Sequence, residues 1–333
     1  MARMSFLDLV PVLDGGSLGD AFLRAGDIAA HCEALGFSRY WVAEHHGMPG
    51  VGGAATSVVL AHVGAATRHL RIGAGGIMLP NHAPLQIAEQ FGTLDALFPG
   101  RIDLGLGRAP GSEGRVAYAL RRSLAGGSDN FVADIRELQG YFAGASEHGF
   151  EAVPGAGADV ALWILGSSTF GAQVAAALGL PYAFASHFAP QMIDAALAAY
   201  RAHFRPSAVL DKPRVMVGCN VFAADDAQEA RWLASSMQQA FVALRSGETR
   251  GGLKPPVEGY WEGLPAPARA MLAEAMRFAA IGTRDDVAGM LRMVLARTGA
   301  DEVIVTSQIF DHRARKRSIA IAAEAMAALS ADA

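Results

Sequence analysis

The chain has 333 residues, of which 52% are hydrophobic and 18% are charged, and its formal net charge is −4. This composition supports a large buried core and excludes a mainly disordered chain, and the lack of a basic excess argues against nucleic acid as a partner. The first eleven residues do not resemble a signal peptide, and no apolar stretch reaches the roughly 18 residues of a membrane span. The two cysteines, Cys32 and Cys219, are isolated in the sequence. We therefore expect a cytoplasmic protein with reduced, buried thiols.

Strand-like and helix-like segments alternate along the chain, a pattern typical of parallel strands joined by crossover helices. Eight strands are predicted, at residues 5–10, 38–43, 70–75, 101–106, 160–165, 180–185, 214–222 and 301–306. Eight helices are predicted, at residues 18–35, 54–66, 84–97, 129–143, 169–178, 191–203, 225–244 and 311–329. The count predicts an α/β fold with one (β/α)8 TIM barrel over residues 1–333. An open doubly wound sheet is the alternative, but it would normally place a glycine-rich loop after the first strand, where this chain has none.

Two insertions interrupt the alternation. Residues 109–127, after the fourth strand, are a glycine-containing connection with many arginines. Residues 246–267, between the seventh and eighth strands, contain Gly251-Gly252 and Pro255-Pro256. In a barrel this position lies at the catalytic face, so we expect residues 246–267 to form a mobile active-site lid. A disordered surface insertion is the alternative.

The second predicted strand ends in a run of ionisable side chains. Glu44, His45 and His46 follow it directly, and they suit acid–base chemistry or metal binding at the C-terminal end of a barrel strand. Three further histidines lack ligand spacing with this group: His82, His187 and His312. We therefore expect no metal site, a structural role for Glu44 and a functional role for one histidine of the pair.

Small and basic residues follow the next three strands. Glycines at 73, 75 and 76 would let a flat ligand approach the backbone, although the pattern alone also fits a tight turn. Arg108 ends the fourth strand, where its guanidinium suits a phosphate. The fifth strand ends at Gly166–Gly171, which opens a helix and offers hydroxyl and N–H groups to an anion or to simple helix capping. Since no nucleophile–base pair is present, these features together favour a phosphate-bearing cofactor that supplies its own chemistry.

Several long motifs occur in order with consistent gaps. They are YWVAEHH at residues 40–46, RIGAGGIMLPNHAP at 71–84, FPGRIDLGLGR at 98–108, WILGSS at 163–168, GLP at 179–181 and DHR at 311–313. With these motifs the chain resembles the luciferase-like monooxygenase superfamily over essentially its whole length. The closest likeness is to the bacterial luciferase family oxidoreductases.

The resemblance implies a (β/α)8 barrel that is usually a homodimer and binds FMN or, in some branches, a deazaflavin. It places Ala74, Gly75 and Gly76 against the flavin ring, with a non-proline cis peptide between Ala74 and Gly76. It assigns the flavin phosphate to Arg108, Ser167, Ser168, Thr169 and Gly171. His45 takes the catalytic position beside the reactive edge of the ring, and Glu44 belongs to the cofactor site by supporting the turn near the ring.

The resemblance also has departures that bear on function. Luciferase has a reactive cysteine where this chain has Gly107 and a glutamate where it has Ser167, so light emission from a long-chain aldehyde is not implied. The prediction is a monooxygenase that uses reduced FMN and oxygen on a small organic substrate, with the reduced flavin supplied by bound NAD(P)H or by a separate NAD(P)H:flavin reductase. The alternatives are a deazaflavin-dependent oxidoreductase that transfers hydride, a non-catalytic flavin-binding protein and, more distantly, a metal-dependent barrel hydrolase.

Overall fold

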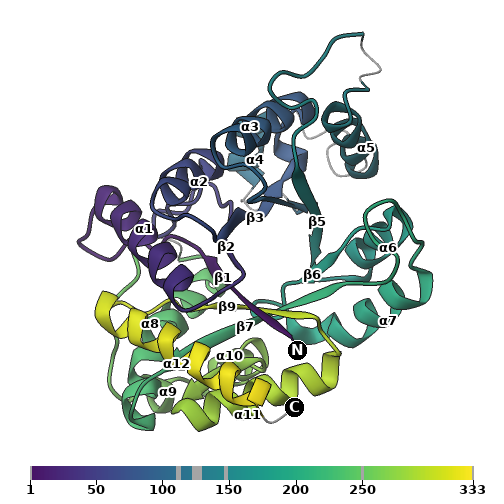
Figure 1. Cartoon of the computed structure of the whole chain (residues 1–333). Coiled ribbons are helices and arrows are strands. Elements are labelled where there is room, and N and C mark those ends of the chain that lie inside the picture. Colours follow the sequence, from purple (N-terminus) through teal and green to yellow (C-terminus); the bar gives the residue numbers. More distant parts are fainter. Residues whose placement is uncertain (1, 110–113, 122–129, 146–148, 249–250, 332–333) are drawn as a thin grey trace.

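The computed structural model describes residues 2–109, 114–121, 130–145, 149–248 and 251–331. Its strands are β1 (Arg3–Asp8), β2 (Arg39–Val42), β3 (Arg71–Met78), β4 (Ile102–Gly107), β5 (Val160–Gly166), β6 (Tyr182–Phe184), β7 (Val215–Ala223), β8 (Ala279–Gly282) and β9 (Glu302–Thr306). Eight of them form a closed parallel barrel in the order β6-β5-β4-β3-β2-β1-β9-β7, and the pairing of β6 with β7 closes it (Figure 1). The predicted barrel is confirmed, with β8 as an additional strand on β7.

Helices surround the barrel. They are α1 (Leu18–Ala34), α2 (Thr56–Ala65), α3 (Pro84–Leu97), α4 (Gly114–Arg121), α5 (Phe131–Phe142), α6 (Thr169–Leu178), α7 (Ile193–His203), α8 (Ala227–Arg245), α9 (Tyr260–Gly263), α10 (Ala266–Ala275), α11 (Arg284–Thr298) and α12 (His312–Ala331), with 3-10 turns η1 (Leu79–Asn81) and η2 (Pro190–Met192). Within the described ranges, the helices lack the continuous apolar length that a bilayer crossing requires. Both cysteines are free and buried, as expected.

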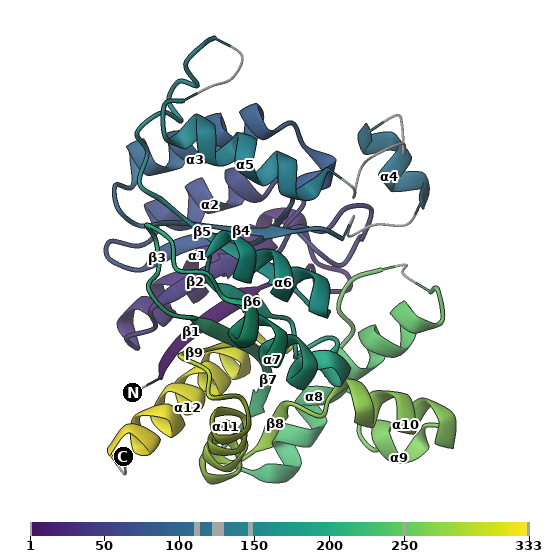
Figure 2. The same ribbon diagram turned by 90° about the vertical axis from the view of Figure 1, so that its right-hand side faces the viewer.

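The chain between β7 and β9 differs from the prediction. Helix 225–244 was expected to be the seventh crossover, but the corresponding α8 packs with α10 and β8 around a small core of its own. The crossover is made by α11, which packs on α12 and β7. No element was predicted at residues 268–300. The strand β8 has four residues and two alanines, too short a run for an alternating pattern. The helix α11, in contrast, has a capping box at Thr283 and Asp286 and ends at Gly299, so its sequence signal was present but not used. Figure 2 shows α4, α9 and α10 on the side opposite the two termini.

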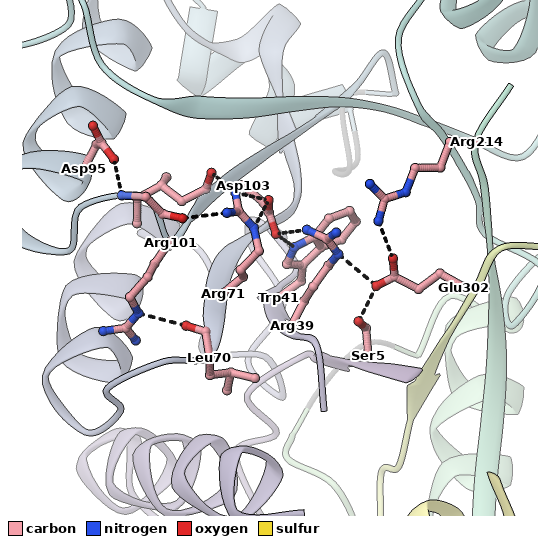
Figure 3. A network of polar contacts seen from close by, with 12 residues as sticks. Ser5, Arg39, Trp41, Leu70, Arg71, Asp95, Arg101, Asp103, Arg214 and Glu302 are labelled. Atoms are coloured by element: carbon pink, nitrogen blue, oxygen red, sulfur yellow. Dashed lines mark hydrogen bonds and ion pairs between the residues drawn. The ribbon is translucent and has the colours of Figure 1, made fainter. Parts of the chain in front are cut away.

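A buried ion-pair network fills the N-terminal end of the barrel (Figure 3). Arg39 donates to Asp103 at 2.7 Å and to Glu302 at 2.8 Å. Arg71 also pairs with Asp103, at 2.8 Å, and Arg214 pairs with Glu302 at 3.3 Å. Both carboxylates are fully buried, and Arg39 is only 3% exposed. Since this end of a barrel serves stability rather than catalysis, we assign the network to the fold.

An apolar layer lies above the network. It consists of Leu7, Trp41, Ala43, Trp163, Ala183, Met216 and Ile304. The rings of Trp41 and Trp163 pack edge to face, with centroids 5.4 Å apart. The Trp41 indole N–H donates to Asp103 at 3.0 Å and so ties this layer to the ion pairs below it. The two layers close the barrel interior beneath the C-terminal strand ends.

Candidate active site

A cavity of about 770 Å³ opens at the C-terminal ends of the strands. Its floor comes from the barrel, with Leu7 in β1, Leu9 after β1, Ala43 after β2 and Gly75 in β3. One wall is the apolar face of α8, including Met237 and Phe241. The volume and the mainly apolar lining with a few polar groups are those of a small-molecule site.

His45 faces this cavity. The side chain follows β2 and is half-buried, and its Nδ1 is buried without a hydrogen-bond partner. Burial lowers the pKa of His45; the carboxylate of Glu44 opposes that shift and His46 adds to it. The imidazole is therefore neutral near pH 7 and can accept or donate a proton.

Glu44, the residue before His45, points away from the cavity into a cluster of hydrogen bonds. Its carboxylate accepts from His46 Nε2 at 2.6 Å, from His82 Nε2 at 2.8 Å and from the Met78 backbone N–H at 3.0 Å. Burial by itself would raise the pKa of Glu44, but these bonds outweigh it and lower the pKa. Glu44 thus joins the β2 turn to β3, and its predicted place in the cofactor site stays a prediction, since its side chain is not on the described cavity lining.

The position of His82 could not be inferred from its spacing in the sequence. The fold brings it to Glu44 and His46, and ligand atoms of the three residues lie within 4.8 Å of one another. Such a group could hold a metal ion, yet each histidine already has Glu44 as its hydrogen-bond partner. The arrangement is satisfied as a structural cluster, so the expectation of no metal site stands as a prediction.

Gly75 and Gly76 lie in the second half of β3, where the pairing with β4 shifts register. The peptide bond between them is cis, which confirms the expectation for residues 74–76. Gly75 lines the cavity, and a Cβ there would meet Leu7 Cδ1 at 2.7 Å. Gly76 lies against the Gly105 carbonyl, which its Cβ would approach to 2.6 Å, and the Ala74 side chain packs into the outer core. Only backbone atoms of these residues can therefore meet a ligand from the floor.

Arg108 and the turn after β5 come together at the neighbouring strand ends. The Arg108 guanidinium carbon lies 4.0 Å from the ring centroid of Phe170, in the first turn of α6. Ser168 is the N-cap residue of α6, but its side chain makes no capping hydrogen bond, contrary to the simple capping alternative. Ser167, Thr169 and Gly171 lie in the same turn, beside the cavity rather than on its lining. The predicted phosphate groups are thus adjacent in space.

Only the first part of the predicted lid, residues 246–267, borders the cavity, and residues 255–267, which include α9 and the start of α10, are not on its described lining. Gly247, Glu248 and residues 251–254 line it, whereas residues 249–250 lie outside the described residues. Leu253 is held by backbone bonds, from its N–H to the Val12 carbonyl at 2.7 Å and from the Asp14 N–H to its carbonyl at 2.8 Å. Residues 247–248 and 251–254 are thus the part of the segment placed to cover the cavity, and the lid role and mobility of residues 246–267 stay a prediction.

Comparison with known proteins agrees with this geometry. The family model for luciferase-like monooxygenases matches residues 4–302. The chain belongs to the luciferase-like monooxygenase family. A protein of Escherichia coli strain K12 described as a luciferase-like monooxygenase is 49% identical over 319 residues, which cover 96% of this chain and 95% of the relative. The crystal structure of apo-MsnO8 superposes with a TM-score of 0.88 at 32% identity and covers 98% of this chain and 99% of that one.

More distant structures share the fold. The oxygenating constituent of 3,6-diketocamphane monooxygenase from Pseudomonas putida, in complex with FMN, has a TM-score of 0.74 at 16% identity, with 98% of each chain covered. An F420-dependent secondary alcohol dehydrogenase with an F420–acetone adduct has a TM-score of 0.70 at 11% identity and covers 97% of this chain and 98% of that one. These two likenesses concern the family barrel alone.

Part of the cavity lining was not predicted from the sequence. Asn220 of β7, Gln308 after β9 and the apolar face of α8 all line it. His187, considered only as a metal ligand, also lines it, and its Nδ1 is buried without a partner. The sequence did offer a signal for His187, since it closely follows the strand predicted at 180–185. His45 was selected as a candidate because it likewise follows the end of a predicted strand.

The burial of His187 has a consequence for stability. Burial, reinforced by His45, lowers the pKa of His187 from its ordinary 6.5 to about 4. Between these values the unfolded chain binds a proton that the folded protein does not, so stability should fall as the pH drops from 6.5 to 4. We expect His187→Leu to lessen this fall by about 2 kcal/mol, measured by urea unfolding at several pH values. Exposed His203→Leu is the control, and an equal pH dependence in both variants would contradict the assignment.

Proposed function

We propose that this protein is a flavin-dependent monooxygenase that uses reduced FMN and oxygen to oxidise a small organic substrate. Family membership supports the reaction class. A phosphate-bearing flavin is supported by one observation, an anion site beside the apolar cavity floor, and this site would serve FMN and a deazaflavin alike. That site is formed by Arg108 and the start of α6.

Two features make this place suitable for a phosphate. Arg108 has no carboxylate partner among the described residues and is exposed, so its charge is available to a ligand. The first N–H groups of α6 lack a side-chain cap, and such groups favour an anion together with the helix dipole. Ser167, Ser168, Thr169 and Gly171 would complete the phosphate contacts.

The cavity provides the place for the ring. The backbone of Gly75 and Gly76 would lie along it, and Leu7 and Leu9 offer apolar contact from the floor. When bound, reduced FMN supplies the electrons that activate oxygen. His45, with an unpartnered buried Nδ1, would move a proton at the reacting atoms. The α8 wall and the segment around Leu253 would exclude water.

One experiment separates this proposal from its alternatives. Purified protein is titrated with FMN and with deazaflavin F420, and oxygen uptake is recorded after the reduced cofactor is added. FMN binding with oxygen uptake is the expected result. Preference for F420 without oxygen uptake would indicate hydride transfer, and FMN binding without any turnover would indicate a non-catalytic flavoprotein. A stoichiometric bound metal would favour the hydrolase.

Arg108→Ala should weaken FMN binding. A lost charge-assisted contact to phosphate is worth about 2–3 kcal/mol, or roughly 30- to 150-fold in Kd. Arg108→Lys should recover part of the loss because it keeps the charge without the bidentate geometry. Fluorescence titration with FMN measures the effect. Arg297→Ala is the matched control, since Arg297 also lies over a phenylalanine ring but pairs with Asp194 on α7. Equal affinities of the Arg108 and Arg297 variants would refute the phosphate assignment.

We further propose a cytoplasmic homodimer that receives its reduced FMN from a separate NAD(P)H:flavin reductase. Light scattering on the purified protein tests the dimer. Oxygen uptake with NADH, FMN and a heterologous flavin reductase, compared with NADH and FMN alone, tests the need for the reductase. Equal uptake in the two mixtures would mean that the protein itself reduces the flavin.

A further inference from the structure

His187 stands apart from the histidines that have structural partners. His46 and His82 are bonded to Glu44, and His312 Nε2 is bonded to Asp27. His187 and His45 make no hydrogen bond through their rings in the described part of the chain, and both line the cavity. A buried polar atom without a partner costs free energy and calls for an explanation at the site itself.

The fold holds the His187 ring in place. The Asn220 side chain donates to the His187 carbonyl at 2.7 Å, and the Ser186 hydroxyl donates to the Gly218 carbonyl at 2.6 Å. These bonds fix the segment after β6 to β7. The ring itself lies on Gly218, where a Cβ would come within 2.1 Å of Nδ1. Only glycine at this position of β7 makes room for the imidazole.

The protonation state defines what the ring can offer. Burial keeps His187 neutral at pH 7, so one ring nitrogen carries a hydrogen and the other does not. Nδ1 is sealed against β7, whereas Nε2 is not among the buried atoms without a partner. An unpaired acceptor is tolerated inside a protein more readily than an unpaired donor. The proton is therefore placed on Nε2, which becomes a donor toward the cavity.

The position of His187 favours the substrate over the cofactor. The proposed phosphate and ring contacts come from β3, β4 and β5, whereas His187 follows β6, farther round the barrel. The neighbouring Phe188 packs edge to face with Phe241 of α8, with centroids 6.1 Å apart. The Arg245 guanidinium lies over both rings, and Asn220 of β7 also lines the cavity, so this side combines aromatic surface with a few polar groups. The charged side chains on the described lining are Glu248 and Lys254 of the lid segment.

We propose that His187 is a substrate-binding residue whose Nε2–H donates to an uncharged oxygen, such as a carbonyl, of an otherwise apolar substrate. This inference rests on the proposed function for its oxidation chemistry and adds the substrate class. His45 faces the same cavity from the β2 side, so the bound oxygen atom would lie among two neutral imidazoles in a mainly apolar cavity.

The test uses two probes of the same shape. Acetophenone carries a carbonyl where α-methylstyrene carries a methylene group, so only the first can accept a hydrogen bond. Ligand-observed NMR titration of the FMN-loaded protein gives the ratio of their dissociation constants. We expect His187→Leu to shift this ratio about five- to tenfold against acetophenone, the contribution of one hydrogen bond. Gly218→Ala, which leaves no room for the ring, should do the same, and His187→Gln should shift it less.

The controls separate the possible failures. His203→Leu should leave the ratio unchanged, and thermal unfolding followed by circular dichroism checks that each variant is folded. An unchanged ratio in both His187→Leu and Gly218→Ala would overturn the proposal. So would a tenfold loss of FMN affinity with no change in the ratio, because the ring would then contact the cofactor. If the wild type fails to bind FMN, the proposed function is wrong, and the same titrations on the cofactor-free protein still decide whether His187 binds the carbonyl.

Discussion

Asp103→Ala is expected to lower the free energy of unfolding by about 3–5 kcal/mol, the usual cost of removing one partner from a buried ion pair. Asp103 is fully buried and accepts from Arg39 and Arg71 and from the indole of Trp41. Its removal leaves the Arg39 guanidinium, itself only 3% exposed, with Glu302 as its remaining carboxylate. Urea unfolding followed by circular dichroism measures the loss.

A second aspartate provides the matched control. Asp194 also pairs with an arginine, Arg297 at 2.6 Å, but both side chains are largely exposed. Such a surface pair contributes at most about 1 kcal/mol, so Asp194→Ala should have a small effect. Asp103→Asn should fall between the two because the amide keeps one acceptor. Similar losses for Asp103→Ala and Asp194→Ala would mean that the buried network does not stabilise the barrel end.

The sequence was most informative where the chain repeats one physical pattern. Strands such as β7 and β9 are continuous buried runs flanked by helices, and these predict a parallel barrel. The pattern fails between β7 and β9. There α8 has the length and periodicity of an ordinary crossover helix, and only its packing on α10 shows that it forms a cavity wall instead. The periodicity of a helix shows that one face is buried, but it does not show which element packs against that face.

Strand ends alone predicted part of the candidate site. Arg108 and the α6 turn were predicted together because β4 and β5 are neighbours in a barrel. The contact of His82 with Glu44 was not predicted, because the chain returns to Glu44 through η1 and sequence spacing does not show that proximity. His187 has no motif around it, and the reason for its placement is Gly218, a residue of another strand. Contacts between residues so far apart in the sequence can be identified only from the three-dimensional structure.

His45→Ala is expected to lower coupled turnover by about 10²- to 10⁴-fold, the range for loss of a general acid–base group. The side chain faces the cavity with an unpartnered Nδ1, and burial lowers its pKa, so the wild-type imidazole is a neutral proton acceptor near pH 7. FMN affinity should change less than tenfold, since the phosphate contacts are assigned to β4 and β5. Product formation and oxygen uptake are measured in parallel with the best substrate from a panel of apolar ketones.

His45→Gln distinguishes proton transfer from simple hydrogen bonding. An amide can still donate and accept hydrogen bonds but does not titrate, so this variant should be nearly as slow as His45→Ala and should lose the acid limb of the wild-type pH profile. His203→Ala serves as the control, because His203 is exposed on α7 and bonds only to the carbonyl of Ala199 in its own helix. If His45→Gln retained turnover within threefold of the wild type, His45 would bind but not transfer a proton. The acid–base role would then pass to another group in the cavity, with His187 the first to replace.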